Sequence, residues 1–102
     1  MKTALQINES DNVATATKNI EQDEKVQIIS PEGDTVIITE SLDYIPFGHK
    51  IAIKPFSEGE EILKYGEIIG LASKQIKPGE WVHVHNVVSA RLHVEGPERG
   101  IL

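Results

Sequence analysis

The sequence of 102 residues predicts a single all-β domain. Two observations predict this class: short runs of alternating or β-branched residues recur along the chain, and clusters of turn residues separate them. The strongest cluster is Pro31-Glu32-Gly33-Asp34, since proline presets φ for a turn and glycine accepts positive φ. The chain is therefore expected to fold as a small set of hairpins.

The expected strands are short, as is usual in such folds. In chain order they cover residues 3–7, 13–18, 26–29, 35–39, 50–54, 68–72 and 81–84. At most one short helix is expected, over residues 57–65, because Ser57 and Glu60 fit a capping box and Gly66 would end the helix.

A weak internal repeat accompanies these strands. Residues 19–26, 56–62 and 76–82 each contain an apolar residue, two variable residues, a glycine or aspartate, a glutamate and then the start of a strand. Repeated units of this kind predict a small β structure folded over on itself. The alternative is that acidic hairpin turns simply look alike.

Composition excludes several classes of function. The formal net charge is -6 without a cluster of Lys or Arg, so the overall field would repel nucleic acid. The chain has no cysteine, which excludes disulfides and thiol chemistry. The polar N-terminus and the lack of any apolar stretch near the roughly 20 residues of a membrane span predict a cytoplasmic protein that does not enter membranes. A domain this small is better suited to sharing an active site with another chain than to enclosing one.

The histidines are the strongest candidates for chemistry. His83 and His85 alternate in an expected strand, which would place both imidazoles on one face as metal ligands or as an acid/base pair. Asn86 follows and would orient substrate. The alternative is an exposed polar face of an edge strand.

Two further turns carry polar side chains that suit an acidic substrate. His49 and Lys50 follow Gly48 at the start of an expected strand, where His49 would act in acid/base catalysis and Lys50 would bind a carboxylate. Lys64 and Tyr65 precede Gly66 and would also contact substrate. The alternatives are a solvated strand start and an ordinary helix C-terminus. Trp81 is expected in the core or an interface, and His93 is expected to be structural or exposed.

Several segments together resemble the SAF-type domain of altronate and galactarate dehydratases, and more closely the small subunits of altronate dehydratase and (2R)-sulfolactate sulfo-lyase. The segments are Asp11-Asn12-Val13-Ala14, Ile45-Pro46-Phe47-Gly48-His49-Lys50-Ile51-Ala52, Ile62-Leu63-Lys64-Tyr65-Gly66-Glu67-Ile68-Ile69-Gly70 and Ile76-Lys77-Pro78-Gly79-Glu80-Trp81-Val82-His83-Val84-His85-Asn86. His49 and Lys50 match all branches of this family, whereas the pair His83 and His85 matches the altronate and sulfolactate branches.

The resemblance implies a β-clip fold, a long bent hairpin folded on itself, over residues 1–88, with residues 89–102 as a C-terminal tail or docking arm. It implies a small subunit of a two-part carbon–oxygen or carbon–sulfur lyase that acts on a small sugar acid or hydroxy acid. A large dehydratase-like subunit would complete the site and would bind most of a divalent metal such as iron or manganese. The expected catalytic residues are then His49 and His85, the substrate-binding residues Lys50, Lys64, Tyr65 and Asn86, and the metal ligands His83 and His85. The alternative function is a non-catalytic assembly or substrate-gating module.

Overall fold

The computed structural model describes residues 1–90, and these form nine strands joined by tight turns. The strands are β1 (Lys2–Leu5), β2 (Val13–Ala16), β3 (Lys25–Ile29), β4 (Thr35–Glu40), β5 (Lys50–Ala52), β6 (Glu61–Lys64), β7 (Glu67–Ala72), β8 (Trp81–Val82) and β9 (Val87–Val88). The expected all-β class is confirmed, and β6 and β9 are strands that the sequence patterns did not predict.

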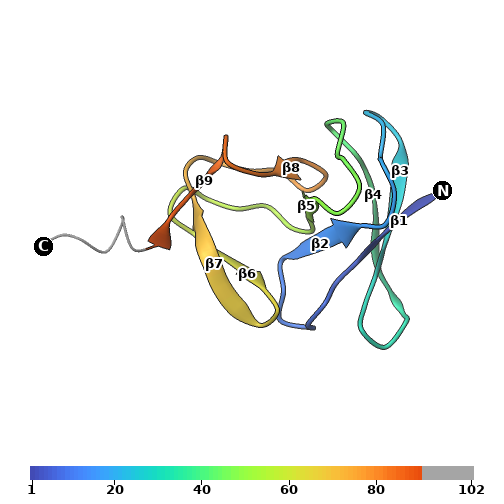
Figure 1. Ribbon diagram of the computed structural model, residues 1–102, viewed down its shortest axis with the longest axis horizontal. Coiled ribbons are helices and arrows are strands. Elements are labelled where there is room, and N and C mark those ends of the chain that lie inside the picture. Colours follow the sequence, from blue (N-terminus) through green and yellow to red (C-terminus); the bar gives the residue numbers. More distant parts are fainter. Residues whose placement is uncertain (91–102) are drawn as a thin grey trace, which may run out of the picture.

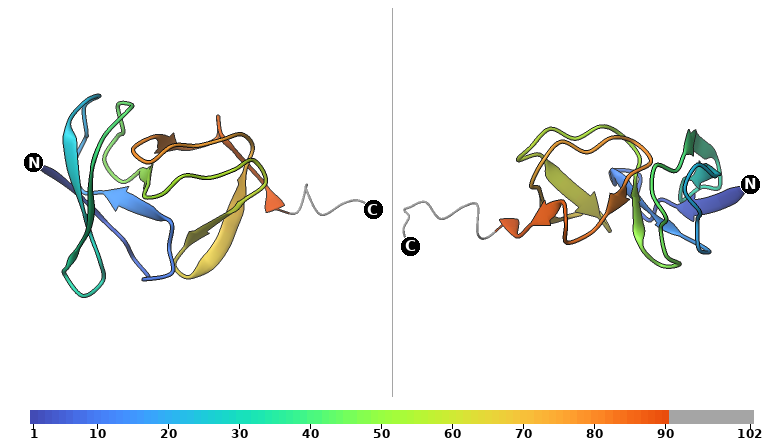
Figure 2. Two further views of the ribbon diagram at one scale, coloured as in Figure 1. Left: turned by 180° about the vertical axis from the view of Figure 1, so that it is seen from behind. Right: turned by 90° about the horizontal axis from the view of Figure 1, so that it is seen from above.

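The strands form a larger and a smaller sheet. The larger has the order β4-β3-β1-β2-β5-β8 and the smaller has the order β6-β7-β9. All neighbouring pairs are antiparallel except β1 and β3, which run parallel. The β3–β4 hairpin lies at one end of the molecule, whereas β6, β7 and β9 lie at the other (Figures 1 and 2). The Pro31–Asp34 turn of the first hairpin is confirmed, with Gly33 at φ 94°.

The short helix expected over residues 57–65 is wrong. The Glu60 carboxylate does accept the Ser57 N–H, at 2.9 Å, but this contact closes a tight turn that leads into β6. Tyr65 and Gly66 both have positive φ, as a two-residue type I′ hairpin requires, and Lys64 pairs with Glu67 across that hairpin. Pairing with β7 supplies the backbone of this segment with hydrogen bonds that a two-turn helix would have had to make alone.

The strand expected over residues 81–84 is shorter than predicted. β8 ends at Val82, and residues 83–86 form a turn in which the Asn86 N–H donates to the His83 carbonyl. The argument that strand alternation places His83 and His85 on one face is therefore wrong. A turn, rather than a strand, carries both side chains.

The internal repeat is confirmed and has one more copy than the sequence suggested. Turns 21–24, 46–49, 57–60 and 77–80 each follow a buried apolar residue and lead into a strand. The third residue of each turn has positive φ: Asp23, Gly48, Gly59 and Gly79. The apolar residues preceding the turns form two antiparallel bridges, Ile20 with Ile45 and Phe56 with Ile76.

Each pair of repeats builds its own core. Ile20 and Ile45 lie in a cluster with Ala4, Val26, Ile28 and Ile51, against which Trp81 packs. Phe56 and Ile76 lie in a second cluster with Val13, Ile62 and Val82. Backbone hydrogen bonds join two of these turns to alanines earlier in the chain. The Gly48 N–H donates to the Ala16 carbonyl, and the Gly79 N–H donates to the Ala52 carbonyl.

The part of the expected C-terminal arm from residue 91 onward, including His93, lies outside the described residues. Within residues 1–90, no helix is long and apolar enough to cross a membrane.

Candidate functional site

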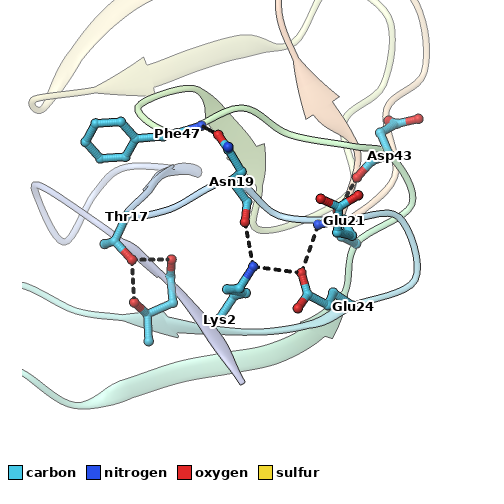
Figure 3. A network of polar contacts seen from close by, with 9 residues as sticks. Lys2, Thr17, Asn19, Glu21, Glu24, Asp43 and Phe47 are labelled. Carbon is cyan, nitrogen blue, oxygen red and sulfur yellow. Dashed lines mark hydrogen bonds and ion pairs between the residues drawn. The ribbon is translucent and has the colours of Figure 1, made fainter.

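Three of the four repeated turns are closed by a glutamate. In each, the carboxylate of the fourth residue accepts the N–H of the first: Glu24 from Glu21 at 2.8 Å, Glu60 from Ser57 at 2.9 Å and Glu80 from Lys77 at 3.0 Å. Figure 3 shows the first of these turns, where Glu24 also accepts from the Lys2 ammonium. These contacts lower the pKa of Glu24, with the backbone hydrogen bond from Glu21 as the largest cause. The glutamate in this position therefore stabilises the turn.

The fourth turn has His49 where the others have glutamate. Its first residue is Pro46, which has no N–H for a side chain to accept. The Phe47 N–H donates instead to Asn19 Oδ1 at 2.8 Å, so a residue from outside the turn caps it (Figure 3). The His49 side chain therefore does not close its turn, as the three equivalent glutamates do.

The His49 side chain lies in a cluster of four rings, which we call the histidine–tryptophan cluster: His49, Trp81, His83 and His85. The Trp81 and His83 rings are stacked, with centroids 4.9 Å apart and planes inclined by 7°. The His49 ring lies 4.9 Å from His83, and the His85 ring lies 5.3 Å from Trp81. His49 comes from the turn that precedes β5, Trp81 from β8, and both other histidines from the turn after β8. The structure thus brings all three candidate histidines together.

Buried polar contacts hold the turn that carries His83 and His85. The Asn86 side chain is fully buried, with Oδ1 accepting the His83 N–H and Nδ2 donating to the Trp81 carbonyl. The Trp81 N–H donates to Asp43 Oδ2 at 3.0 Å. Asn86 therefore supports the turn in this conformation, and its expected contact with substrate stays a prediction.

Lys50 and His83 line a pocket of about 260 Å³ beside the cluster. Apolar side chains complete its walls, namely Ile69, Val84, Val87 and Val88, together with Ser89. Loss of hydration lowers the pKa of the half-buried Lys50, and the charge of Lys64 lowers it further. Desolvation also lowers the pKa of His83, followed by the effects of His49, Lys50 and His85. The pocket thus combines apolar walls with groups that gain from a nearby anion.

No carboxylate neutralises this pocket within residues 1–90. The ion pairs in that part of the chain join Lys2 to Glu24 and Lys54 to Glu60, and neither Lys50 nor Lys64 belongs to one. Lys50 therefore has no carboxylate counter-ion in this part of the chain. The arrangement suits a small acid or an acidic side chain from another polypeptide.

Lys64 and Tyr65 lie at the tip of the β6–β7 hairpin. The Lys64 ammonium is 4.9 Å from the centroid of the exposed Tyr65 ring. The buried Asp11 carboxylate anchors this tip by accepting the N–H groups of Asn8, Tyr65 and Gly66. The expected contacts of Lys64 and Tyr65 with substrate stay predictions.

The described residues do not form a metal site by themselves. No group of three or more histidine, aspartate or glutamate side chains within residues 1–90 is arranged to hold a metal ion. His49 Nδ1 already accepts a hydrogen bond from Trp81 Nε1 at 3.2 Å. His83 and His85 are at most part of a ligand set, so the expected metal would need most of its ligands from another polypeptide.

Sequence reasoning missed Trp81, Asn19 and Asp43 as parts of this site. A signal for the site was nevertheless present in the repeat. Residues 45–50 follow the repeated pattern with His49 in place of the glutamate, so the departure of this one copy from the repeat marks the site.

Comparison with known proteins gives consistent results. The altronate/galactarate dehydratase SAF domain matches residues 2–90. Altronate dehydratase of Bacillus subtilis is 38% identical over 86 residues, which cover 84% of this chain and 16% of that protein. The (2R)-sulfolactate sulfo-lyase subunit alpha of Chromohalobacter salexigens is 45% identical over 58 residues, covering 57% of this chain and 62% of that protein. Its counterpart in Paracoccus pantotrophus is 33% identical over 64 residues, covering 63% and 94%.

The match to the dehydratases accounts for only a small part of their length, whereas the match to the Paracoccus subunit accounts for nearly all of it. The expected resemblance and the expected β-clip fold are confirmed. The chain belongs to the altronate/galactarate dehydratase SAF domain family.

Proposed function

We propose that this chain is the small subunit of a two-part lyase that removes water or sulfite from a sugar acid or hydroxy acid. The relatives named altronate dehydratase, galactarate dehydratase and sulfo-lyase subunit alpha support a lyase. The word subunit in the sulfo-lyase names supports a second polypeptide. The large, dehydratase-like subunit would supply most of the catalytic groups and hold any iron or manganese.

The observation that carries the proposal is the exchange of a structural glutamate for His49. Three equivalent turns use glutamate to close the turn, while the fourth is capped by Asn19 and leaves an imidazole beside two others. A shared active site gains a histidine held on a rigid turn, which suits acid/base chemistry or hydrogen bonding to substrate.

The chemistry of the substrates fits the pocket. Elimination from a hydroxy acid removes a proton beside a carboxylate and expels a group from the next carbon, so negative charge develops near the carboxylate. Lys50 would bind the carboxylate, and His49 and His85 would act on the developing charge or the leaving group. The open pocket of about 260 Å³ is at the small end for ligand sites, which is consistent with a second polypeptide closing it.

The test is to purify the chain alone and with a co-expressed large subunit, and to assay altronate and (2R)-sulfolactate. We expect no turnover from the chain alone and turnover of one substrate from the complex. Full activity of the chain alone would refute the two-part proposal.

The second candidate is an assembly or substrate-gating module. The exposed apolar side chains beside the pocket, Ile69 and Val84 at 41% and 80% exposure, favour it as a docking surface. In that case Val84→Asp would prevent complex formation, and histidine substitutions would leave turnover intact in the assembled complex.

A further inference from the structure

The ring of His49 has a defined hydrogen-bond partner. Trp81 Nε1 lies 3.2 Å from His49 Nδ1. An indole N–H can only donate, so His49 Nδ1 must present a lone pair. A neutral imidazole carries one proton, which in this geometry must be on Nε2.

We propose that Trp81 is a positioning residue that fixes neutral His49 as its Nε2–H tautomer, so that His49 serves the shared site as a hydrogen-bond donor rather than as the base. This inference rests on the proposed function, because it assigns the role of His49 within that site. The donor would stabilise negative charge that develops on a substrate oxygen. The proton beside the substrate carboxylate would then be taken by another group.

The indole is held firmly enough to impose this choice. The backbone N–H of Trp81 donates to Asp43 Oδ2, and the Trp81 carbonyl accepts from the buried Asn86 side-chain amide. The Trp81 ring stacks on that of His83. On the other side, Ala16 N–H donates to the His49 carbonyl at 2.8 Å, which fixes the backbone of the turn. Donor and acceptor are therefore both anchored, and the hydrogen bond does not depend on a mobile side chain.

The remaining nitrogen is available for substrate. His49 is partly exposed, and its Nε2 makes no hydrogen bond within residues 1–90. His49 does not itself line the pocket, but its ring lies 4.9 Å from that of His83, which lines the pocket together with Lys50, so the proposal places the His49 N–H at the edge of this pocket. Two donors toward one anion are the arrangement expected of a site that stabilises an enediolate or a departing oxygen.

The first test is nuclear magnetic resonance of the full chain at a pH where His49 is neutral. Long-range ¹H–¹⁵N spectra should show a protonated Nε2 and an unprotonated Nδ1 for His49. The chain has one tryptophan, so its single indole N–H signal reports the bond directly. We expect His49→Leu to shift this signal and to speed its exchange with water, while the control His85→Leu, whose ring contacts Trp81 without a hydrogen bond, changes the exchange little.

Trp81→Phe keeps an aromatic ring but lacks the donor. In this variant we expect His49 to show a mixture of both neutral tautomers, with the fold checked by far-ultraviolet circular dichroism. A protonated Nδ1 in the unaltered chain would overturn the proposal even if the variant failed to fold. Unchanged ¹⁵N shifts of His49 in folded Trp81→Phe would overturn it as well.

The second test uses the assembled complex. Trp81→Phe should lower kcat by roughly 10- to 100-fold with little change in KM, since a misplaced catalytic group affects the transition state most. Unchanged kcat in this variant, together with loss of turnover in His49→Ala, would refute the positioning role and leave the proposed function intact. Unchanged kcat in both variants would instead refute the proposed function at His49.

Discussion

The turns at residues 77–80 and 46–49 share a backbone conformation, but the side chains at their fourth positions make different contacts. Both follow a buried isoleucine, contain a glycine with positive φ at the third position and donate that glycine's N–H to an alanine carbonyl. In the first, Glu80 closes the turn by accepting the Lys77 N–H. In the second, Pro46 removes the donor and His49 contacts Trp81 and His83 instead. His49 can make these contacts because Asn19 supplies the cap of its turn.

The two turns also differ in their surroundings. A methyl group added to Gly79 would lie 2.2 Å from the Glu40 carbonyl oxygen, whereas one added to Gly48 would meet nothing within 4 Å. Gly79 is packed against Glu40 and Leu42, whereas the Cβ position of Gly48 faces open space. The two turns therefore differ in how tightly the glycine at their third position is packed.

The largest expected effect is on turnover, which should depend on the histidine turn and not on a glutamate turn. In the complex with the large subunit, His49→Ala should lower kcat by ~10²–10⁴-fold, the range for a positioned proton-transfer group or an oxyanion donor. The matched control Glu60→Ala removes the cap of an equivalent turn whose glutamate contacts Ser57 and Lys54, and it should leave kcat near normal. Turnover is measured after confirming that each variant binds the large subunit. If His49→Ala, His83→Ala and His85→Ala all keep near-normal kcat, the chain is an assembly module.

The next largest effect is on stability, which should fall more when the glycine of the 77–80 turn is replaced than when that of the 46–49 turn is. Gly79→Ala should destabilise the chain by about 2–5 kcal/mol, combining the cost of a left-handed conformation with the clash against Glu40. Gly48→Ala carries only the conformational cost of about 1–2 kcal/mol. Urea unfolding followed by tryptophan fluorescence measures both. Equal losses in the two variants would mean that packing does not distinguish the turns.

A smaller change in stability is expected when the histidine turn is converted to the glutamate type. The double variant Pro46→Lys with His49→Glu restores the donor and the carboxylate. The new hydrogen bond contributes about 1 kcal/mol and loss of proline costs about 0.4–1 kcal/mol, so stability should stay within about 1 kcal/mol of the unaltered chain. Turnover of the complex should nevertheless be lost. Activity retained by this variant would show that the imidazole is dispensable.

The smallest expected effect is on the stability of the fold at acidic pH. The pKa of Glu24 is lowered from its ordinary value of 4.5, mainly by the Glu21 N–H and the Lys2 ammonium. A carboxylate with a lowered pKa stabilises the fold above its ordinary pKa, and this contribution is lost as the pH falls through the lowered value. Glu24→Gln should therefore flatten the fall in stability below about pH 4.5, as measured by thermal unfolding across pH. An unchanged slope would mean that other carboxylates dominate acid unfolding.

Much of the fold followed from local chemistry. The turn at residues 31–34 was predictable because proline and glycine restrict the backbone by themselves, and most strand positions were predictable from alternation. A helix was expected over residues 57–65 because the Glu60 carboxylate accepts the Ser57 N–H in this tight turn just as it would in a capping box, so the local pattern does not distinguish a helix from a strand. Only pairing with β7 decided between them.

The sequence by itself determined the all-β class, the repeated turns and the candidate histidines. The expectation that His83 and His85 lie together rested on a wrong reason, since a turn held by Asn86 and not strand alternation carries both side chains. Tertiary structure alone decided that Trp81 joins the three imidazoles and that Asn19 releases His49, because each contact joins residues 28 to 32 positions apart in the chain. Such contacts depend on how the hairpins fold over one another, and short-range patterns of polarity and turn residues carry no information about that arrangement.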